Sequence, residues 1–366
     1  MSGSDSGPLR VGLVGAGEIA GHHLTAYREH PDRVQLVAVC DISREAAQRR
    51  ASEAGGVQVF TDVDEMLRTA EIDAVDICTV HDTHAPMAIA AAESGRHVLV
   101  EKPMACTLAD AQRMVDVAER AGVTLMVAQT MRYEQSSLLV RDALLAGAIG
   151  RPRALRLELM LDFTRYYREG SWAYDASRAG GGVVIMTAVH LLDLARFWLG
   201  EVESVSARSW TSRPDLFVNG AEDGAVTTLQ FESGVVGDLM TMGSVPGLVP
   251  GGGIWSRTAL FGDEGTLSAE AVILPEAPVF PEMVLRSLTP ETKDGAAVYP
   301  TRTLKAADDD PGTNPYVEEI LHFEQACRTG SEPLTSGRDN LQTIRLVAAV
   351  YESARTGQPV APGEVR

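Results

Sequence analysis

The sequence predicts an α/β protein in which a doubly wound parallel sheet is followed by an α+β domain with a mostly antiparallel sheet. Three observations lead to this prediction. Short β-branched apolar runs alternate with helix-period segments up to about Ala128, a glycine-rich turn follows the first run, and the later strands alternate with a period of two. The chain has 366 residues, so at roughly 150 residues per domain we expect two domains, at 1–128 and 129–366.

The first domain is predicted from five apolar segments that have the character of strands. They are LRVGLVGA, VQLVAVC, AVDICTV, HVLVE and TLMVA. Several are apolar on both faces, which is typical of parallel strands covered by helices on each side. Between them, Thr83–Ser94 and Leu108–Ala121 carry apolar stripes, and each is followed by a glycine, the residue that commonly ends a helix.

The second domain is predicted from segments in which apolar and polar residues alternate. The predicted strands are Ala154–Leu161, Val202–Trp210, Ala225–Phe231 and Val235–Thr241, and the predicted helices are about Gly182–Leu199, Pro315–Cys327 and Asp339–Thr356. Turn signals separate the strands, so we expect mostly antiparallel pairing. The polar stretch 285–314 and the glycine-rich stretch 247–255 are predicted to be surface connections or lids.

The charge balance and the cysteine content exclude several classes of protein. Fifty Asp and Glu residues against 32 Lys and Arg residues give a net charge of -18, a field that repels nucleic acids and anionic membranes. No apolar run reaches the roughly 18 residues that cross a bilayer, and the N-terminal segment lacks signal-peptide features, so we expect a cytoplasmic protein. The four cysteines form no C-x-x-C pair, which argues against a disulfide framework, and we expect no metal.

A glycine motif directly after the first strand predicts a dinucleotide site. The motif reads GAGEIA, in which Gly15 permits a tight turn, Gly17 lets the backbone approach a pyrophosphate, and the small Ala20 allows the helix to pack closely on the sheet. The helix N-terminus, with Glu18 and Ile19, offers free N–H groups to the anion. We therefore expect these residues to bind the cofactor.

Asp41 ends the second predicted strand and points to NAD. In dinucleotide-binding folds, a carboxylate roughly 20 residues after the glycines binds the adenosine ribose hydroxyls. Asp41 follows the glycines at close to this spacing. This carboxylate would repel a 2′-phosphate, so NAD is favoured over NADP, although Arg44 is near enough to accommodate such a phosphate or to stack on adenine. Alternatively, Asp41 only stabilises the N-terminus of the next helix.

The segment HVLVEKP places Glu101, Lys102 and Pro103 at the carboxyl edge of the predicted sheet, where ligands bind in such folds. A lysine ammonium beside a nicotinamide ring can hydrogen-bond the hydroxyl that is oxidised and relay its proton. A lone lysine at a strand end is more often solvated surface, but the EKP context favours the functional interpretation.

These motifs resemble the Gfo/Idh/MocA family of NAD(P)-dependent oxidoreductases. The resemblance covers almost the whole chain and includes blocks that begin CTVHDTHAP, SWAYD and CRTGSEP. It implies a Rossmann domain followed by an α+β domain whose large, open sheet often supports dimers or tetramers. It also implies hydride transfer at a carbon that bears a hydroxyl or carbonyl group in sugars, cyclic polyols and related compounds.

The resemblance assigns roles to five residues. Lys102 matches the catalytic lysine, and His84 and Glu101 match positions beside the cofactor. His190 matches the histidine that helps to handle the substrate proton, and Trp172 matches a tryptophan near the substrate pocket. From the residues alone, His190 is more often a core histidine in such an apolar stretch, and Trp172 is nearly as well explained as a buried anchor.

The chain departs from the family pattern at two places. Many members carry a carboxylate four residues before the histidine, on the same helix face, where this chain has Met186. We therefore expect a more apolar substrate pocket or a proton relay that depends more on Lys102. The family's T-P-N reads T-V-H here, so the nicotinamide-side contact by Thr79 and His81 is expected to differ. Asp193 could partly replace the missing carboxylate, but an Asp at this position more often makes a structural contact.

Three functions are compatible with the sequence. The leading one is an NAD-dependent dehydrogenase or reductase of a sugar, glycoside or cyclic polyol, in which Lys102 binds the reacting oxygen and His190 assists proton transfer. One alternative is a glycosidase that retains NAD and acts through a 3-keto intermediate, or another enzyme that processes 3-keto-glycosides. The other is a non-catalytic sensor of NAD or a sugar, which the retained Lys102 and His190 argue against. We expect a homodimer or homotetramer with a small-molecule substrate and neither nucleic-acid nor membrane partners.

Overall fold

The computed structural model describes residues 7–246, 253–273, 283–289, 291–293, 296–304 and 314–365. Contacts divide the chain into two compact units. The first comprises Met1–Tyr133 and Thr313–Leu341, and the second comprises Glu134–Gly312 and Gln342–Arg366. The domain ranges 1–128 and 129–366 stay a prediction, and the contact grouping differs from them because it assigns 313–341 to the first unit.

The first unit contains the predicted doubly wound parallel sheet. Its strands are β1 (Leu9–Val14), β2 (Val34–Cys40), β3 (Gln58–Phe60), β4 (Ala74–Ile77), β5 (His97–Glu101) and β6 (Leu125–Ala128). They lie in the order β3-β2-β1-β4-β5-β6 and pair in parallel. The winding therefore reverses between β1 and β4, the place where such sheets bind ligands at the carboxyl ends of the strands. Only the edge strand β3 is absent from the predicted set, because three residues carry too little periodicity to be recognised.

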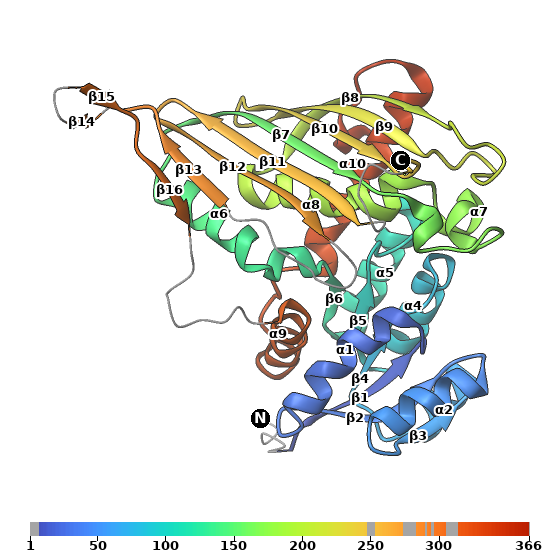
Figure 1. The fold of residues 1–366 in the computed structure, drawn as a ribbon. Helices are drawn as coiled ribbons and strands as arrows, with labels where there is room; N and C mark the ends of the chain where they lie inside the picture. The colour runs from blue at the N-terminus through green and yellow to red at the C-terminus, as the bar shows by residue number, and fades with distance from the viewer. Residues whose placement is uncertain are drawn as a thin grey trace. The chain divides into compact units, whose positions relative to one another are not determined.

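Helices follow the strands and cover the sheet of the first unit (Figure 1). They are α1 (Glu18–Glu29), α2 (Arg44–Glu53), α3 (Val63–Thr69), η1 (His81–Thr83), α4 (His84–Glu93), α5 (Leu108–Ala121), η2 (Thr130–Tyr133) and α9 (Pro315–Thr329). Helix α4 packs on α5, and α1 packs on α9. The central strands are apolar on both faces and almost completely buried, as parallel strands between two helix layers must be.

Helix α9 joins the first unit although it lies near the C-terminal end of the sequence. Its residues Val317, Ile320 and Phe323 recur every three positions, so they share one face, and all are buried in one cluster with Leu24 and Tyr27 of α1. This apolar stripe explains why contacts assign the segment to the first unit. Sequence periodicity predicts the helix but contains no information about which domain buries it.

The second unit contains the predicted, mostly antiparallel sheet. Its strands are β7 (Pro152–Met160), β8 (Val202–Trp210), β9 (Gly224–Phe231), β10 (Val236–Met242), β11 (Ile254–Gly262), β12 (Gly265–Ile273), β13 (Met283–Ser287) and β16 (Thr301–Leu304). The order is β16-β13-β12-β11-β7-β10-β9-β8, and β7 and β10 form the parallel pair within it. Along β7, Leu155, Leu157 and Leu159 are buried while Arg156 between them is exposed, which is the alternation expected of a sheet with one covered face.

One predicted connection in this unit is corrected. Part of the polar stretch 285–314 forms β13 and β16, together with a separate hairpin of β14 (Glu291–Lys293) and β15 (Ala296–Val298). Most of these strand residues are exposed, and the sequence of this stretch lacks the regular apolar alternation that reveals a strand. Residues 305–313 and the glycine-rich 247–252 lie outside the described residues.

Helices cover one face of the second sheet (Figure 1). They are α6 (Gln135–Leu145), α7 (Ala176–Ala179), a π-helical turn (Val184–Ala188), α8 (Val189–Leu199) and α10 (Gly337–Thr356), with short 3₁₀ turns η3 (Phe163–Arg165), η4 (Trp172–Tyr174) and η7 (Pro362–Glu364). The sequence has no uninterrupted apolar run of the length expected for a membrane span, but one helical segment among the described residues is long and apolar enough by composition. This segment, Ala176–Leu199, has the length and hydropathy of a membrane-spanning helix. However, 72% of its most apolar window is buried inside the structure, as in the core helix of a globular domain.

Candidate active site

The glycine motif lies in the turn between β1 and α1. Gly15 has φ of 92°, and a Cβ atom there would lie 2.4 Å from the carbonyl oxygen of Cys78, so only glycine fits. Gly17 is the exposed N-cap of α1, and no atom of the described residues lies within 4 Å of its Cβ position. No described side chain caps this helix end. The N–H groups of its first turn, which includes the exposed Glu18 and the half-buried Ile19, are therefore available to an anion.

The carboxylate of Asp41 joins this turn to the next helix. Its Oδ2 accepts a hydrogen bond from the N–H of Ala16 at 2.8 Å, and its Oδ1 accepts one from the N–H of Ser43 at 2.7 Å. Ser43 is the N-cap of α2, and Arg44 is exposed in the first turn of that helix. Asp41 thus makes the helix-end contact of the alternative interpretation and also lies beside the glycine turn. Each carboxylate oxygen has further capacity to accept a hydroxyl.

His84 lies between the ends of β4 and β5. This ring is fully buried at the start of α4, with Nδ1 2.8 Å from the carbonyl oxygen of Pro103 and Nε2 3.1 Å from that of Thr79. Burial lowers the pKa of His84, so the neutral ring is favoured, in which one nitrogen donates. The Thr79 hydroxyl accepts a hydrogen bond from Thr83 at 2.7 Å. His81, buried in η1, has its ring centroid 5.6 Å from that of His84.

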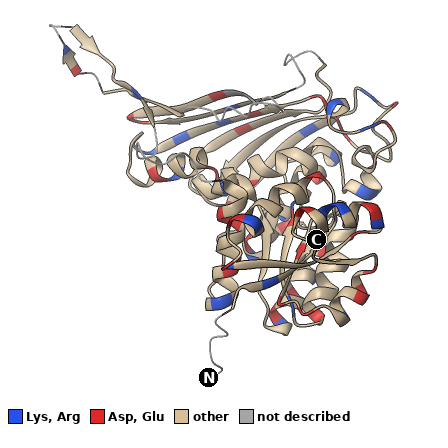
Figure 2. Cartoon of the chain, turned by 60° about the horizontal axis from the view of Figure 1, so that its bottom comes forward, with Lys and Arg blue, Asp and Glu red and all other residues tan. Residues whose placement is uncertain are grey.

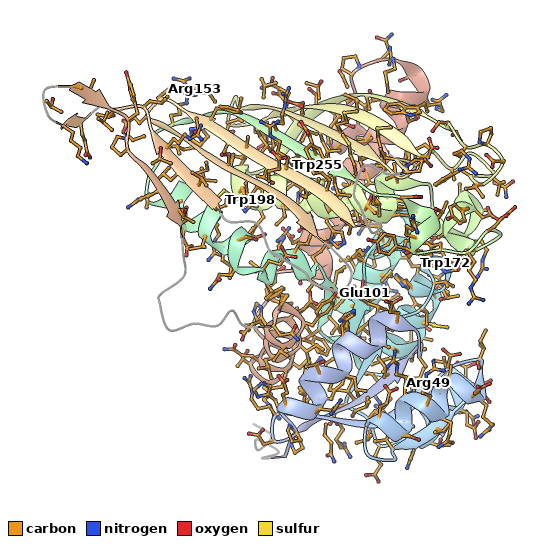
Figure 3. The ribbon with its side chains drawn as sticks, viewed as in Figure 1. Arg49, Glu101, Arg153, Trp172, Trp198 and Trp255 are labelled. Atoms are coloured by element: carbon orange, nitrogen blue, oxygen red, sulfur yellow. The ribbon has the colours of Figure 1, made fainter. Side chains whose placement is uncertain are left out.

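Glu101 ends β5 and Lys102 follows it at the carboxyl edge of the sheet; Figure 3 labels Glu101. The Glu101 carboxylate is buried, and its Oε2 accepts a hydrogen bond from the backbone N–H of Lys102 at 2.9 Å. Burial lowers the pKa of the Lys102 ammonium, while the charge of Glu101 acts in the opposite direction. A lysine with a lowered pKa exchanges a proton more readily near neutral pH than an exposed one does. Its next peptide bond, to Pro103, is cis.

A buried cluster that the sequence analysis does not identify lies next to Glu101. His23, Asp76 and Cys78 place potential metal-ligand atoms within 4.8 Å of one another. Hydrogen bonds account for their proximity, because His23 Nδ1 lies 2.9 Å from Asp76 Oδ2 and 3.5 Å from Cys78 Sγ. The expectation of no metal stays a prediction. His23 lies on α1, and its partners are more than 50 positions away along the chain. The sequence therefore contains no local pattern that would reveal the cluster.

In the second unit, Met186 and His190 lie on a helical segment that contains a π turn. Met186 is in the turn and almost completely buried, whereas His190 is half-buried in the first turn of α8. The sequence predicts a regular helix here, and the expectation that these two side chains share a face rests on α-helical spacing. The π turn replaces that spacing with hydrogen bonds that span five residues. Such turns are rare and frequently occur at functional sites.

The start of this helical segment is held by Glu222, a residue that the sequence analysis does not single out. Its buried carboxylate accepts hydrogen bonds from the N–H groups of Gly182 and Val184, both at 2.8 Å. The Tyr351 hydroxyl donates to the same carboxylate at 3.1 Å and accepts the N–H of Ile185 at 3.2 Å. The N-terminal N–H groups of the segment that bears His190 are thus satisfied by side chains from distant positions.

Asp193 makes structural contacts. Its buried carboxylate accepts a hydrogen bond from the Thr343 hydroxyl at 2.7 Å and lies 3.9 Å from Nη1 of Arg196. Arg196 itself donates to Thr343 at 2.8 Å. These bonds join α8 to α10 and favour the structural interpretation of Asp193 over a role in place of the missing family carboxylate.

Trp172 extends from η4, as labelled in Figure 3. Its ring centroid lies 6.1 Å from that of Tyr167 in an edge-on arrangement. Tyr167 in turn contacts an aromatic cluster formed by Phe163, Tyr174 and Phe217. Trp172 is half-buried at the border of this cluster, a position that agrees both with an anchor and with a pocket wall.

Comparisons with known proteins decide the family. Residues 9–129 match the model of the Gfo/Idh/MocA oxidoreductase family with an NAD-binding Rossmann fold, and residues 137–268 match that of the Gfo/Idh/MocA C-terminal domain. The chain belongs to this family. The family and the fold class predicted from the sequence are thereby confirmed, as are an oxidoreductase activity and NAD as the cofactor.

Similar proteins match over nearly the whole chain. D-apiose dehydrogenase of Paraburkholderia graminis is 34% identical over 95% of this chain and 88% of its own length. Myo-inositol 2-dehydrogenase of Thermotoga maritima is 27% identical over 98% of this chain and 99% of its own length. The solved structure of the WlbA dehydrogenase of Bordetella pertussis with NADH and UDP-GlcNAcA has a TM-score of 0.79 and 29% identity over 97% of this chain and 98% of that one.

The geometry around the glycine turn fits NAD. A side chain at Gly17 would occupy the open space into which the first turn of α1 directs its N–H groups. Asp41 lies at the neighbouring strand end with both carboxylate oxygens fixed by backbone donors. The residues that would hold the pyrophosphate and the ribose therefore come from two adjacent strand ends of one sheet.

Proposed function

We propose that this oxidoreductase transfers a hydride between NAD and a carbon that bears a hydroxyl or carbonyl group in a sugar, glycoside or cyclic polyol. The observation that carries the proposal is the lysine at the carboxyl end of β5, with a pKa lowered by burial, in a chain whose glycine turn fits a dinucleotide. Relatives named as dehydrogenases of D-apiose and myo-inositol support polyhydroxylated substrates. When bound, NAD supplies the hydride chemistry.

Lys102 is proposed to bind the reacting oxygen and to exchange its proton. Its lowered pKa makes the neutral amine more available, and this amine can accept the hydroxyl proton when the alcohol is oxidised. The ammonium that results can donate that proton to the carbonyl oxygen in the reverse reaction. Glu101 accepts the Lys102 backbone N–H and so fixes the point from which the lysine side chain departs. His84 fixes the other side of this segment through the Pro103 carbonyl and reaches Thr79 at the end of β4. Thr79 and His81 are proposed to contribute the nicotinamide-side contacts at that strand end.

His190 is proposed to assist proton transfer, and Trp172 and Met186 are proposed to contact substrate. Met186 offers no charge to orient an imidazole, so proton transfer depends more on Lys102 here than in family members with a carboxylate at this position. The Glu222 cap supports these roles because it fixes the first turn of the helical segment that bears Met186 and His190.

The protein is proposed to be a cytoplasmic homodimer or homotetramer that binds neither nucleic acid nor membranes. One face of the second sheet is covered by no helix of the described residues, and it supports self-association because it exposes Val226, Val236 and Phe261 by 40%, 45% and 44%. Between them lies an ion pair of Arg156 with Asp238 at 3.1 Å. Acidic and basic residues are interspersed on this sheet (Figure 2), a mixture in which one copy can complement another. Light scattering would test this, and a monomer at working concentration would contradict it.

The substrate class is tested by a panel of aldoses, ketoses, glycosides and inositols with NAD and, separately, NADP. Reduction of NAD is followed by NADH absorbance, and the reverse reaction by its loss with the corresponding keto compounds. We expect turnover with at least one polyhydroxylated compound and none with simple alcohols. Activity confined to simple alcohols, or no hydride transfer with any of these compounds, would contradict the proposal.

A further inference from the structure

Beside Lys102, polar side chains from three elements of the first unit are enclosed in its core. His23 and Tyr27 come from α1, Asp76 from β4 and Glu101 from β5. His23 and Asp76 have no exposed surface, and Tyr27 and Glu101 are each 5% exposed. Burying two carboxylates is unfavourable unless they are paired and hydrogen-bonded.

His23 bridges the two carboxylates. Its Nδ1 lies 2.9 Å from Asp76 Oδ2, and its Nε2 lies 3.2 Å from Glu101 Oε1. The Tyr27 hydroxyl donates to Asp76 Oδ2 at 2.7 Å, so it strengthens the Asp76 side of the bridge only. Ionised carboxylates only accept hydrogen bonds, so two such contacts require a proton on each ring nitrogen.

The surroundings favour the doubly protonated ring. Burial opposes the imidazolium, but the charges of Asp76 and then Cys78, followed by the hydrogen bonds to the same two residues, raise the pKa of His23 well above its usual value. A further carboxyl, Glu319 of α9, accepts a hydrogen bond from the Thr130 hydroxyl at 3.0 Å. Burial raises the pKa of Glu319 well above its usual value, which favours its neutral form. The protonated His23 ring then lies between the carboxyl groups of Asp76 and Glu101 and contacts both.

Glu101 is the part of this cluster that reaches the proposed catalytic lysine. One oxygen, Oε1, faces His23, and the other, Oε2, accepts the backbone N–H of Lys102 at 2.9 Å. A carboxylate held at both oxygens cannot rotate without breaking one bond. The Lys102 backbone is therefore linked to α1 through a single buried side chain.

We propose that His23 is a positioning residue for hydride transfer, because its Nε2–H holds the Glu101 carboxylate in the orientation that fixes the Lys102 backbone. This inference rests on the proposed function of Lys102, and it assigns to His23 no contact with substrate or cofactor. It predicts that only the Nε2 side of the ring matters for catalysis, whereas both sides matter for stability.

Two substitutions separate the two sides of the ring. In His23→Gln the amide nitrogen can take the place of Nε2 and still donate to Glu101, whereas in His23→Asn it can take only the place of Nδ1 and donate to Asp76. Both remove the same imidazolium charge. We expect kcat to fall by about tenfold or more in His23→Asn and to stay within about threefold in His23→Gln, with KM and the Kd for NADH little changed in either. A tenfold loss corresponds to about 1.4 kcal/mol in the barrier.

Three further variants complete the test. The effects of His23→Asn and Glu101→Gln on kcat should be non-additive, because both break the same link. Tyr27→Phe removes a hydrogen bond from the Asp76 side, so it should lower the melting temperature and leave kcat unchanged. Lys102→Ala reports on the proposed function itself. If Lys102→Ala stops turnover but His23→Asn does not slow it, only the positioning role is wrong.

A second readout does not depend on turnover. Amide hydrogen exchange at Lys102, followed by NMR in the folded protein, reports whether its N–H is still held by Glu101. We expect exchange about tenfold faster in His23→Asn than in wild type and nearly wild-type exchange in His23→Gln. Equal exchange in both variants would overturn the proposal whether or not a substrate has been found, and equal kcat in both would overturn it once a substrate is known.

Discussion

The same physical cause, burial, acts in opposite ways on two histidines of the first unit. His84 faces two backbone carbonyls, whose dipoles stabilise an imidazolium only weakly, so burial dominates and its pKa is lowered. His23 lies between the carboxylates of Asp76 and Glu101, and although burial opposes its charge, the charges of Asp76 and Cys78 and its hydrogen bonds to them outweigh burial, so its pKa is raised. The identity of the acceptor therefore decides the charge of each ring.

This difference predicts opposite pH dependences. With a folded-state pKa below about 6.5, His84 contributes stability that is present above that pH and lost as the pH falls. With a folded-state pKa above it, His23 contributes stability that is present below about pH 6.5 and lost as the pH rises through its folded value. Imidazole NMR of the folded protein at neutral pH should find His84 neutral and His23 charged. The same protonation state for both rings would contradict this account.

Asp41 predicts the cofactor preference. We expect Asp41→Ala to weaken NAD binding by about tenfold, or about 1.4 kcal/mol, and to narrow the preference over NADP, because a ribose acceptor and a charge that repels the 2′-phosphate are both lost. Asp62→Ala is the matched control, since Asp62 likewise accepts a backbone N–H at a helix start, that of Glu65 in α3. Titration of both dinucleotides against both variants measures the effect. If the preference for NAD over NADP is unchanged in Asp41→Ala, or changes equally in Asp62→Ala, Asp41 does not determine the cofactor preference.

Residues with a local motif could be predicted from the sequence, and residues that act through distant contacts could not. Gly15 and Lys102 stand in short patterns next to a strand, so their places in the fold follow from strand, turn and strand end. His23 and Glu222 have no such pattern. The partners of His23 lie 53 and 78 positions away along the chain. The backbone N–H groups that Glu222 binds lie 38 and 40 positions away.

At the scale of elements, the helical segment with the π turn depends on a close backbone approach. A Cβ atom at Gly182 would lie 1.8 Å from the carbonyl oxygen of Glu222. Glycine is therefore required at Gly182, where the backbone of Glu222 passes the start of the helical segment. The sequence predicts the helix from its apolar content, but periodicity does not distinguish a π turn from an α turn. Both the backbone and the carboxylate of Glu222 therefore contact the first turn of this segment and fix its position.

Gly182→Ala is therefore expected to destabilise the protein by about 1–3 kcal/mol, the range for forcing extra atoms into a packed site. Gly363→Ala is the matched control, since no described atom lies within 4 Å of its Cβ position. Urea unfolding of both variants gives the comparison, and Gly363→Ala should differ little from wild type. Similar free energies of unfolding for the two variants would show that the helix start can move away from Glu222.

At the scale of the whole molecule, the order of elements along the chain predicts each sheet but not every packing partner. Alternating strands and helices fix the parallel sheet, and period-2 strands with turn signals fix the antiparallel one. The assignment of α9 to the first unit depends on which apolar face its stripe of Val317, Ile320 and Phe323 finds. This packing is a tertiary contact, which the order of elements along the chain does not reveal. From that order alone, α9 would be placed in the second unit, with the elements that precede it in sequence.

The proposed function requires that Lys102 take part in hydride transfer and not merely in cofactor binding. The most direct test is single-turnover NADH absorbance with Lys102→Ala, wild type and Lys293→Ala, whose lysine is exposed on β14. We expect the hydride-transfer rate of Lys102→Ala to fall by roughly 10²-fold or more, with the Kd for NADH within a few fold of wild type and Lys293→Ala unaffected. A Lys102→Ala protein that binds NADH and transfers hydride at the wild-type rate would contradict the account.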